Sequence, residues 1–152
     1  MTEPAEPHWL TIARAELGVH EDTGPGTNPR VAEYLKAGHL HPDDSIAWCS
    51  AFLCWVMDQA HMKSTGRGAA RSWASWGRPL TTGRLGAVTV LWREDPSGHK
   101  GHVGLWVKET PDSVYLLGGN TGNAVAIHQF PKSRVLAYRF PGADDYLTPM
   151  TP

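Results

Sequence analysis

The chain has 152 residues, a formal net charge of −1, 41% hydrophobic residues and 19% charged residues. This length suits one compact domain, and the composition is that of a globular protein rather than a disordered one. The balanced charge and the absence of a long basic run argue against nucleic acid or an anionic membrane as the main partner. No apolar run approaches the ~20 residues that a spanning helix needs, so we expect no membrane insertion.

The chain ends differ in composition from the rest. Residues 1–7 are acidic and proline-rich, and they lack the basic start and apolar core of a signal peptide. Residues 141–152 form a second proline-rich stretch. We therefore expect loose termini at 1–7 and 141–152 of a single domain that takes up the chain (1–152), and synthesis in the cytoplasm without a signal peptide.

The first half of the chain carries helical signals. Apolar residues at helical spacing predict an amphipathic helix over residues 9–17, which Gly18 is placed to end. Asn28 followed by Pro29 is typical of a helix start, and this second helix should stop near Gly38. A fourth helical segment is expected over residues 69–76, where packing of the tryptophans in the core is favoured over lining of a groove.

Between these lies the stretch 43–57, which reads as a polar loop turning into a buried helix with Cys49 in its first turn. The unpaired N–H groups and the dipole at a helix start favour thiolate over thiol. Cys54 lies past the first turn, so it is interpreted as core packing. The two Cα atoms would be about 8 Å apart on one helix, beyond the usual limit for a disulfide.

From residue 86 onward the pattern changes to short strands. The expected strands are 86–93, 102–108, 113–117, 124–129 and 135–140, separated by clusters of turn residues. Such short connections indicate antiparallel pairing in a meander. The sequence therefore predicts an α+β fold, with N-terminal helices packed on a C-terminal antiparallel sheet of about five to six strands.

Two residues of these strands could work with the thiol. His102 opens a strand between two glycines, and Asn120 follows two glycines at the end of the next strand. In a hairpin the end of one strand lies beside the start of the other, which brings Asn120 near His102. An amide oxygen that accepts from one ring N–H would leave the other ring nitrogen free to take the proton of Cys49. A structural histidine and a turn asparagine are the alternative readings of these residues.

Metal binding is a rival use of the histidines. His39 and His41 are two residues apart, and His99 and His102 are three apart, but no H-E-x-x-H and no C-x-x-C pair is present. Zinc would need three or four ligands from scattered loops. The acidic loop residues lack EF-hand spacing for calcium. We expect no metal and no other cofactor.

Taken together, the motifs resemble a known family. They are Glu16-Leu17-Gly18-Val19, Asn28-Pro29-Arg30, Trp48-Cys49-Ser50-Ala51-Phe52, Ala70-Arg71-Ser72-Trp73, Gly101-His102-Val103-Gly104, Gly118-Gly119-Asn120 and Pro131-Lys132-Ser133-Arg134-Val135-Leu136. In this order they resemble the CHAP and NlpC kinds of small papain-like cysteine hydrolases, which cut peptidoglycan peptides. The match is closest to a compact subgroup found in phage lysins, and it extends over residues 9–140.

The resemblance implies a papain-like fold with the nucleophile on a buried helix. It assigns Cys49 as nucleophile, His102 as base and Asn120 as the residue that orients the ring. Many CHAP enzymes carry a glutamate two residues before this asparagine, where the present chain has Gly118. The third catalytic role therefore depends on Asn120 by itself. Candidates to line the substrate groove are Trp48, Arg71, Trp73 and Trp76.

The implied function is hydrolysis of an amide bond in the stem peptide of the bacterial cell wall, by an endopeptidase or an N-acetylmuramoyl-L-alanine amidase. A bacteriolytic phage endolysin, acting as a monomer on the wall after release through a holin, is the favoured setting. The first alternative is an effector delivered to the periplasm by a secretion system and paired with an immunity protein. The second is a non-catalytic module that binds wall peptides.

Overall fold

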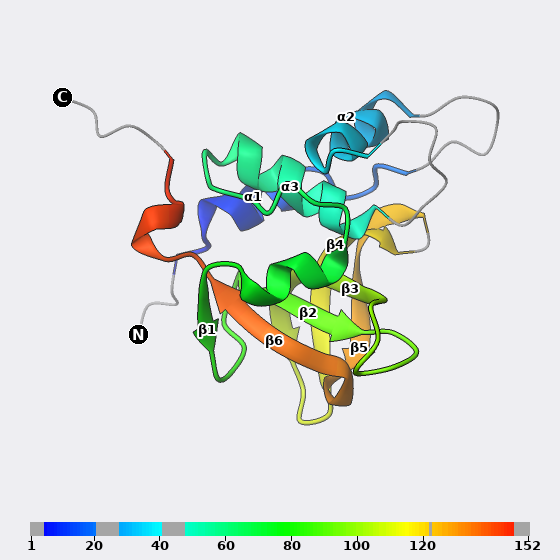
Figure 1. Cartoon of the computed structure of the whole chain (residues 1–152), viewed down its shortest axis with the longest axis vertical. Helices are drawn as coiled ribbons and strands as arrows, with labels where there is room; N and C mark the ends of the chain where they lie inside the picture. Colours follow the sequence, from blue (N-terminus) through cyan, green and yellow to red (C-terminus); the bar gives the residue numbers. More distant parts are fainter. Residues whose placement is uncertain (1–4, 21–27, 41–47, 122, 148–152) are drawn as a thin grey trace.

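The computed structural model describes residues 5–20, 28–40, 48–121 and 123–147 (Figure 1). Three α-helices come first in the chain, α1 (His8–Arg14), α2 (Pro29–Ala37) and α3 (Cys49–Gln59). Short 3-10 helices follow at η1 (Ala70–Ser75), η2 (Lys132–Arg134) and η3 (Ala143–Asp145). The strands are β1 (Arg78–Leu80), β2 (Val88–Trp92), β3 (Gly101–Glu109), β4 (Ser113–Thr121), β5 (Ala124–Pro131) and β6 (Val135–Phe140). The α+β class is therefore confirmed.

A membrane-spanning helix is not found among the described residues, because none of their helices combines the required length and apolar character.

The first helix is shorter than the apolar spacing predicted. α1 ends at Arg14, and the chain turns until Gly18, whose φ is +96°. The N–H of Gly18 donates to the carbonyl of Val125 on β5 at 3.0 Å. This backbone contact with a distant strand competes with continuation of the helix, and a local pattern cannot reveal it.

The start and end of α2 are confirmed. The side chain of Asn28 accepts from the N–H groups of Arg30 and Val31 at 2.8 and 3.4 Å, and Pro29 is the first helical residue. Gly38 caps the C-terminus, where an added Cβ would lie 2.8 Å from the Cβ of Ala51. The absence of a side chain at Gly38 therefore lets α2 approach α3 closely.

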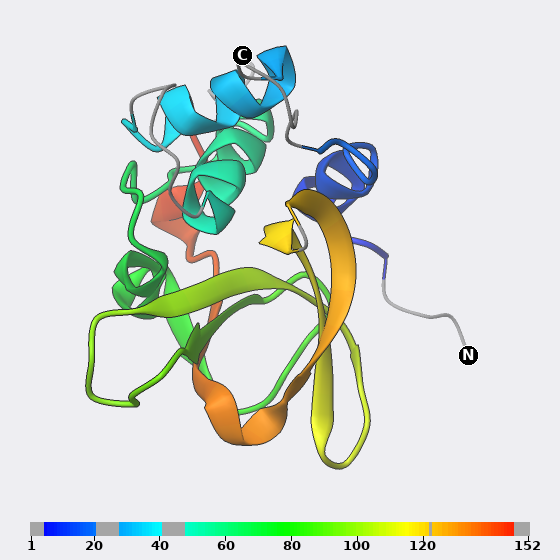
Figure 2. The ribbon, with the colours of Figure 1, turned by 90° about the vertical axis from the view of Figure 1, so that its right-hand side faces the viewer.

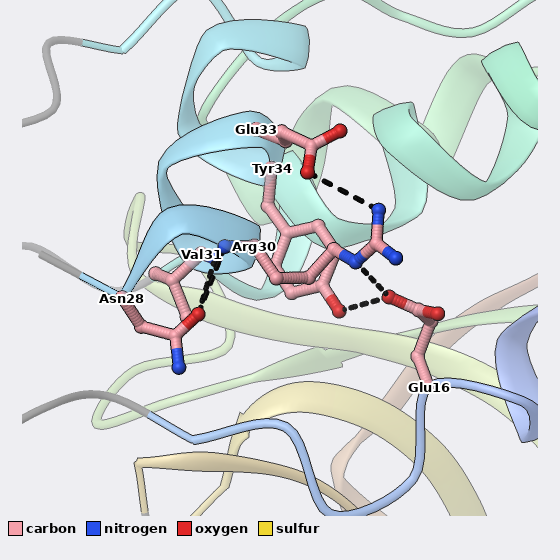
Figure 3. A network of polar contacts seen from close by, with 6 residues as sticks. All are labelled: Glu16, Asn28, Arg30, Val31, Glu33 and Tyr34. Carbon is pink, nitrogen blue, oxygen red and sulfur yellow. Dashed lines mark hydrogen bonds and ion pairs between the residues drawn. The ribbon is translucent and has the colours of Figure 1, made fainter.

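A buried polar network holds α2 in place (Figure 3). The carboxylate of Glu16, which is 8% exposed, accepts from the hydroxyl of Tyr34 at 2.7 Å and pairs with Nε of Arg30 at 3.0 Å. Burial and the neighbouring Glu16 carboxylate raise the pKa of Tyr34, so the phenol stays a donor. The Tyr34 ring stacks on Trp48, with centroids 5.6 Å apart, and packs edge-on against Phe52. The network thus supports the residues at the start of α3.

The middle of the molecule is α3. Every residue from Cys49 to Met57 is buried, so this part of the helix is enclosed, as the prediction of a buried helix requires. It packs on α2, β3 and β4. The segment expected as a fourth helix is the 3-10 helix η1, and Trp73 and Trp76 belong to the core, as favoured for them.

The strand order in the sheet is β1-β6-β2-β3-β4-β5, and each neighbouring pair is antiparallel. The predicted meander is correct from β2 to β5 but wrong for β6, which returns to pair with β2 instead of β5. Strand β1 was not predicted, because three residues are too few to show an alternation of apolar and polar side chains. Its proline has no N–H to donate to a neighbouring strand, which suits its place at the edge of the sheet. Figure 2 shows the sheet strongly curled, with the three α-helices gathered over one side.

Candidate functional site

The thiol of Cys49 sits at the first residue of α3 and is 3% exposed. Burial raises the pKa of this thiol, although backbone N–H groups of Val103, Ser50 and Cys49 itself act in the opposite direction. The sequence reasoning counted the helix terminus and expected a favoured thiolate. That expectation is wrong for the resting protein, because the desolvation of the sulfur outweighs the N–H groups around it.

The thiol lies near the end of the ladder between β3 and β4, where the two strands are still in contact: an added Cβ on Gly118 would lie 3.2 Å from the carbonyl oxygen of Val103. The pairing between β3 and β4 runs from Leu105 opposite Leu117 to Glu109 opposite Val114, while residues 101–104 of β3 pair with β2. Past Leu117, β4 continues alongside β5. An added Cβ on Gly119 would lie 2.6 Å from the ring of Trp48, so the start of α3 presses directly on the end of β4. We call this region, with its thiol, the β3–β4 gap.

The imidazole of His102 occupies the same gap. It is the second residue of β3, immediately before the Val103 whose N–H acts on the thiol. A Cβ on Gly118 would lie 3.3 Å from Nε2 of His102 and 3.2 Å from the carbonyl oxygen of Val103. Nε2 therefore points at the end of β4, and it is buried without a hydrogen-bond partner among the described residues.

Its environment strongly disfavours the imidazolium form. Burial is the largest cause, and together with the positive charges of Arg134 and Arg93 and the ring of His128, in that order, it lowers the pKa of His102 to about 4. The ring lies 5.0 Å from the ring of Phe130. In the resting protein burial thus favours the neutral form of the His102 imidazole and the protonated form of the Cys49 thiol.

Acid should destabilise the protein through this residue. The pKa of His102 falls from 6.5 to about 4 on folding, so the neutral ring contributes stability that is complete above pH 6.5 and is lost as pH falls towards 4. At pH 4.5 we expect a loss of about 2 kcal/mol relative to pH 7. Urea unfolding at both pH values measures it.

The His102→Gln variant has no ring to titrate and should show a smaller loss than wild type. The exposed His99, changed to Gln, controls for general effects of removing an imidazole. Equal losses in wild type and His102→Gln would contradict the buried neutral ring.

Asn120 belongs to β4 by its backbone, two residues after Gly118, which itself meets His102. The side chain of Asn120 lies outside the described part of the structure. Its predicted role in orienting the His102 ring therefore stays a prediction. Within the described part, no hydrogen bond joins Sγ of Cys49 to the His102 ring. The structure therefore places the N–H of Val103, the residue after His102, by the Cys49 thiol, and points the His102 ring at the strand that carries Asn120.

The four groove candidates have other contacts. Trp48, Trp73 and Trp76 are 1%, 0% and 6% exposed and pack in the core, so they offer little surface to a ligand. Arg71 donates to the carbonyl oxygens of Lys100, Pro96 and Asp95 at 2.7–2.9 Å. It clamps the hairpin loop between β2 and β3, directly before His102. The anchoring of this loop is what the sequence reasoning missed.

Across the residues that the structure describes, no group of three or more His, Cys, Asp or Glu side chains is placed to hold a metal ion. The acidic residues at 21–22 and 43–44, and His41, lie outside those residues. No protein-family model matches the chain, and no curated protein is significantly similar to it.

Proposed function

We propose that this protein is a cysteine hydrolase that cleaves an amide bond in the stem peptide of bacterial peptidoglycan. The observation that supports the proposal is that the N–H of Val103 acts on the Cys49 thiol, while the neighbouring His102 points its Nε2 at Gly118 on β4. The motif order around these residues, which resembles that of the papain-like CHAP and NlpC hydrolases, supplies the substrate class. Cys49 is the nucleophile, His102 the base and Asn120 the orienting residue.

The mechanism starts from neutral groups. Because burial disfavours both thiolate and imidazolium, the proton passes from Cys49 to His102 as the sulfur attacks the amide carbonyl. The backbone N–H of Cys49 at the start of α3 donates to the oxyanion that forms. The imidazolium then gives its proton to the leaving amine, and water attacks the acyl-enzyme, with His102 as the base again.

The biological setting follows the same resemblance. A phage endolysin that reaches the wall after release through a holin is the preferred role, and a secreted effector neutralised by an immunity protein is the alternative. Cleavage within the stem peptide and cleavage at the sugar–peptide amide are both compatible with acyl transfer at Cys49. The masses of the released fragments distinguish these two bonds.

The test is digestion of purified peptidoglycan, with the products identified by mass spectrometry. We expect release of peptide fragments that stops after treatment with a thiol alkylator and continues in the presence of a chelator. Loss of activity with the chelator alone would instead favour a zinc peptidase.

A second candidate function is a wall-peptide-binding module with an inert thiol. The 3% exposure and raised pKa of Cys49 favour it. Sedimentation of the protein with walls of several chemotypes, without any cleavage, would support this reading over the hydrolase.

The absence of a side chain at Gly118 should matter for catalysis. Its replacement by alanine puts a Cβ 3.2 Å from the carbonyl oxygen of Val103 and 3.3 Å from Nε2 of His102, so that both β3 and the ring must shift by a few tenths of an ångström. Because small displacements of catalytic groups are costly, we expect kcat/KM to fall roughly ten- to a hundredfold. Thermal unfolding should show that the variant still folds.

The matched control is Gly142→Ala, where the nearest atom to the added Cβ is Oδ2 of Asp145 at an ordinary 3.5 Å. It should keep the wild-type kcat/KM. If Gly118→Ala cleaves as fast as this control, the position of the His102 ring does not limit the reaction.

A further inference from the structure

Positively charged side chains from two loops converge on His102. The first is Arg93, which directly follows β2. Leu91 lies opposite His102 in the β2–β3 register, and the N–H of Arg93 donates to the carbonyl of Lys100 at 3.2 Å, so the hairpin pairing continues past the strand end. Side chains alternate along a strand, which places Arg93 on the face of His102 as its diagonal neighbour.

The effect of Arg93 reaches both reacting groups. Its positive charge lowers the pKa of the Cys49 thiol and also that of His102. The side chain is exposed, and its guanidinium has no hydrogen bond or ion pair with another described residue. The guanidinium of Arg93 is therefore available at the surface to an anionic group of a ligand.

The second side chain is Arg134, the last residue of η2. Its Nε donates to the carbonyl of Trp92 at 2.9 Å, next to Arg93 in the chain. Its guanidinium carbon lies 5.9 Å from the ring of Phe130, which is itself 5.0 Å from the His102 ring. Arg134 is thus held beside Phe130, which packs on His102, and its charge acts on the His102 ring. No described carboxylate pairs with Arg134.

His128 completes the set of titratable groups that act on His102. It lies on β5 opposite Leu116, two residues before Phe130 and on the same face of the strand. Among the described residues, none of the charges that act on His102 is negative. The proposed base must nevertheless carry a positive charge during the reaction, so an anion beside the two arginines would make that charge less costly.

From this arrangement we infer that Arg93 and Arg134 form a carboxylate-binding subsite beside His102, and that the enzyme selects acidic peptides with a free carboxylate close to the scissile amide. This inference rests on the proposed function. The planar guanidinium fork suits a carboxylate, with two parallel N–H donors for its two oxygens. A bound carboxylate places negative charge beside the arginines when the His102 ring takes up the thiol proton.

The test uses two synthetic stem peptides that are identical except for one glutamyl carboxyl group, free in one and amidated in the other. Wild-type protein should cleave the free acid with at least tenfold higher kcat/KM, mainly through a lower KM. In Arg93→Gln the preference should shrink to about threefold or less. Arg78→Gln removes an exposed arginine from the edge strand β1 and should keep the full preference.

Binding to the Cys49→Ala variant is measured by calorimetry with the same two peptides, so that the subsite is tested even without turnover. At least tenfold tighter binding of the free acid supports the subsite, and equal or undetectable binding of both peptides overturns it. Discrimination in binding without cleavage by wild type would overturn the proposed hydrolase instead. Cleavage of both peptides at equal kcat/KM would leave the hydrolase standing and overturn the subsite.

Discussion

The Cys49→Ala variant is expected to release no peptide from purified peptidoglycan, a loss of at least about a thousandfold in rate. The sulfur is the atom that would form the acyl-enzyme, and alanine offers no replacement for it. The fold should survive the change, because the side chain makes no hydrogen bond to another side chain in the described structure. Fragment analysis by mass spectrometry measures the loss.

Cys54 is the internal control for this experiment. It lies on the same helix and is also a free, buried thiol, but its sulfur faces Thr65 and the carbonyl of Arg67 rather than the β3–β4 gap. Cys54→Ala should therefore retain most of the activity, with a small fall in Tm from the lost packing. If Cys49→Ala digests walls as fast as Cys54→Ala, the cysteine mechanism is wrong.

The rate of alkylation adds a further check on the resting state. Burial raises the pKa of Cys49, so iodoacetamide should label it slowly at pH 7 and faster as pH rises. Intact-mass measurements of Cys54→Ala follow the labelling of Cys49 alone. Rapid labelling at pH 6, as for a preformed thiolate, would contradict the neutral thiol that the mechanism starts from.

The largest expected effect on stability belongs to Trp73. Trp73→Ala should lower the free energy of unfolding by about 3–5 kcal/mol, the cost of emptying a large buried aromatic site. The indole is fully buried, packs edge-on against Trp76, and donates from Nε1 to Oγ of Ser50 at 2.7 Å. Ser50 Oγ in turn donates to the carbonyl of Arg67. The variant therefore also removes a hydrogen bond to Ser50 in the first turn of α3.

Urea unfolding of two further variants separates these contributions. Trp73→Phe keeps an aromatic ring but removes the donor to Ser50, so its cost should lie well below that of alanine. Leu136→Ala removes an apolar side chain that is 39% exposed and should cost less than about 1 kcal/mol. A loss below 1.5 kcal/mol for Trp73→Ala would mean that the site collapses around the missing ring.

Features that depend on neighbouring residues were predictable from the sequence. The Asn28-Pro29 start of α2 follows from backbone geometry over three or four residues, and the β2-to-β5 hairpins follow from turn chemistry. Features that depend on distant partners were not. The return of β6 to β2, and the early end of α1 where Gly18 meets Val125, are set by contacts across the fold.

The same division holds at the candidate site. The polar loop before an apolar stretch placed Cys49 at a helix start, and the strand pattern placed His102 at a strand start; both positions are correct. The direction of the thiol pKa was missed, because it depends on how tightly β3, β4 and α3 close around the sulfur. Arg71 was interpreted as a surface residue for substrate, but the position of its carbonyl partners in the β2–β3 loop is a property of the folded chain.

The place of β6 has a consequence for how the chain is made. β6 lies between β1 and β2, yet it is synthesised after the other five strands. Until residues 135–140 leave the ribosome, β2 lacks one neighbour and β1 has none, so a nascent chain carries open strand edges that can pair with other chains. Because the pairing of β6 with β2 spans more than forty residues of chain, closure of the sheet is also a slow, non-local step. Translation that stops before β6 should therefore yield chains that are captured by chaperones or aggregate.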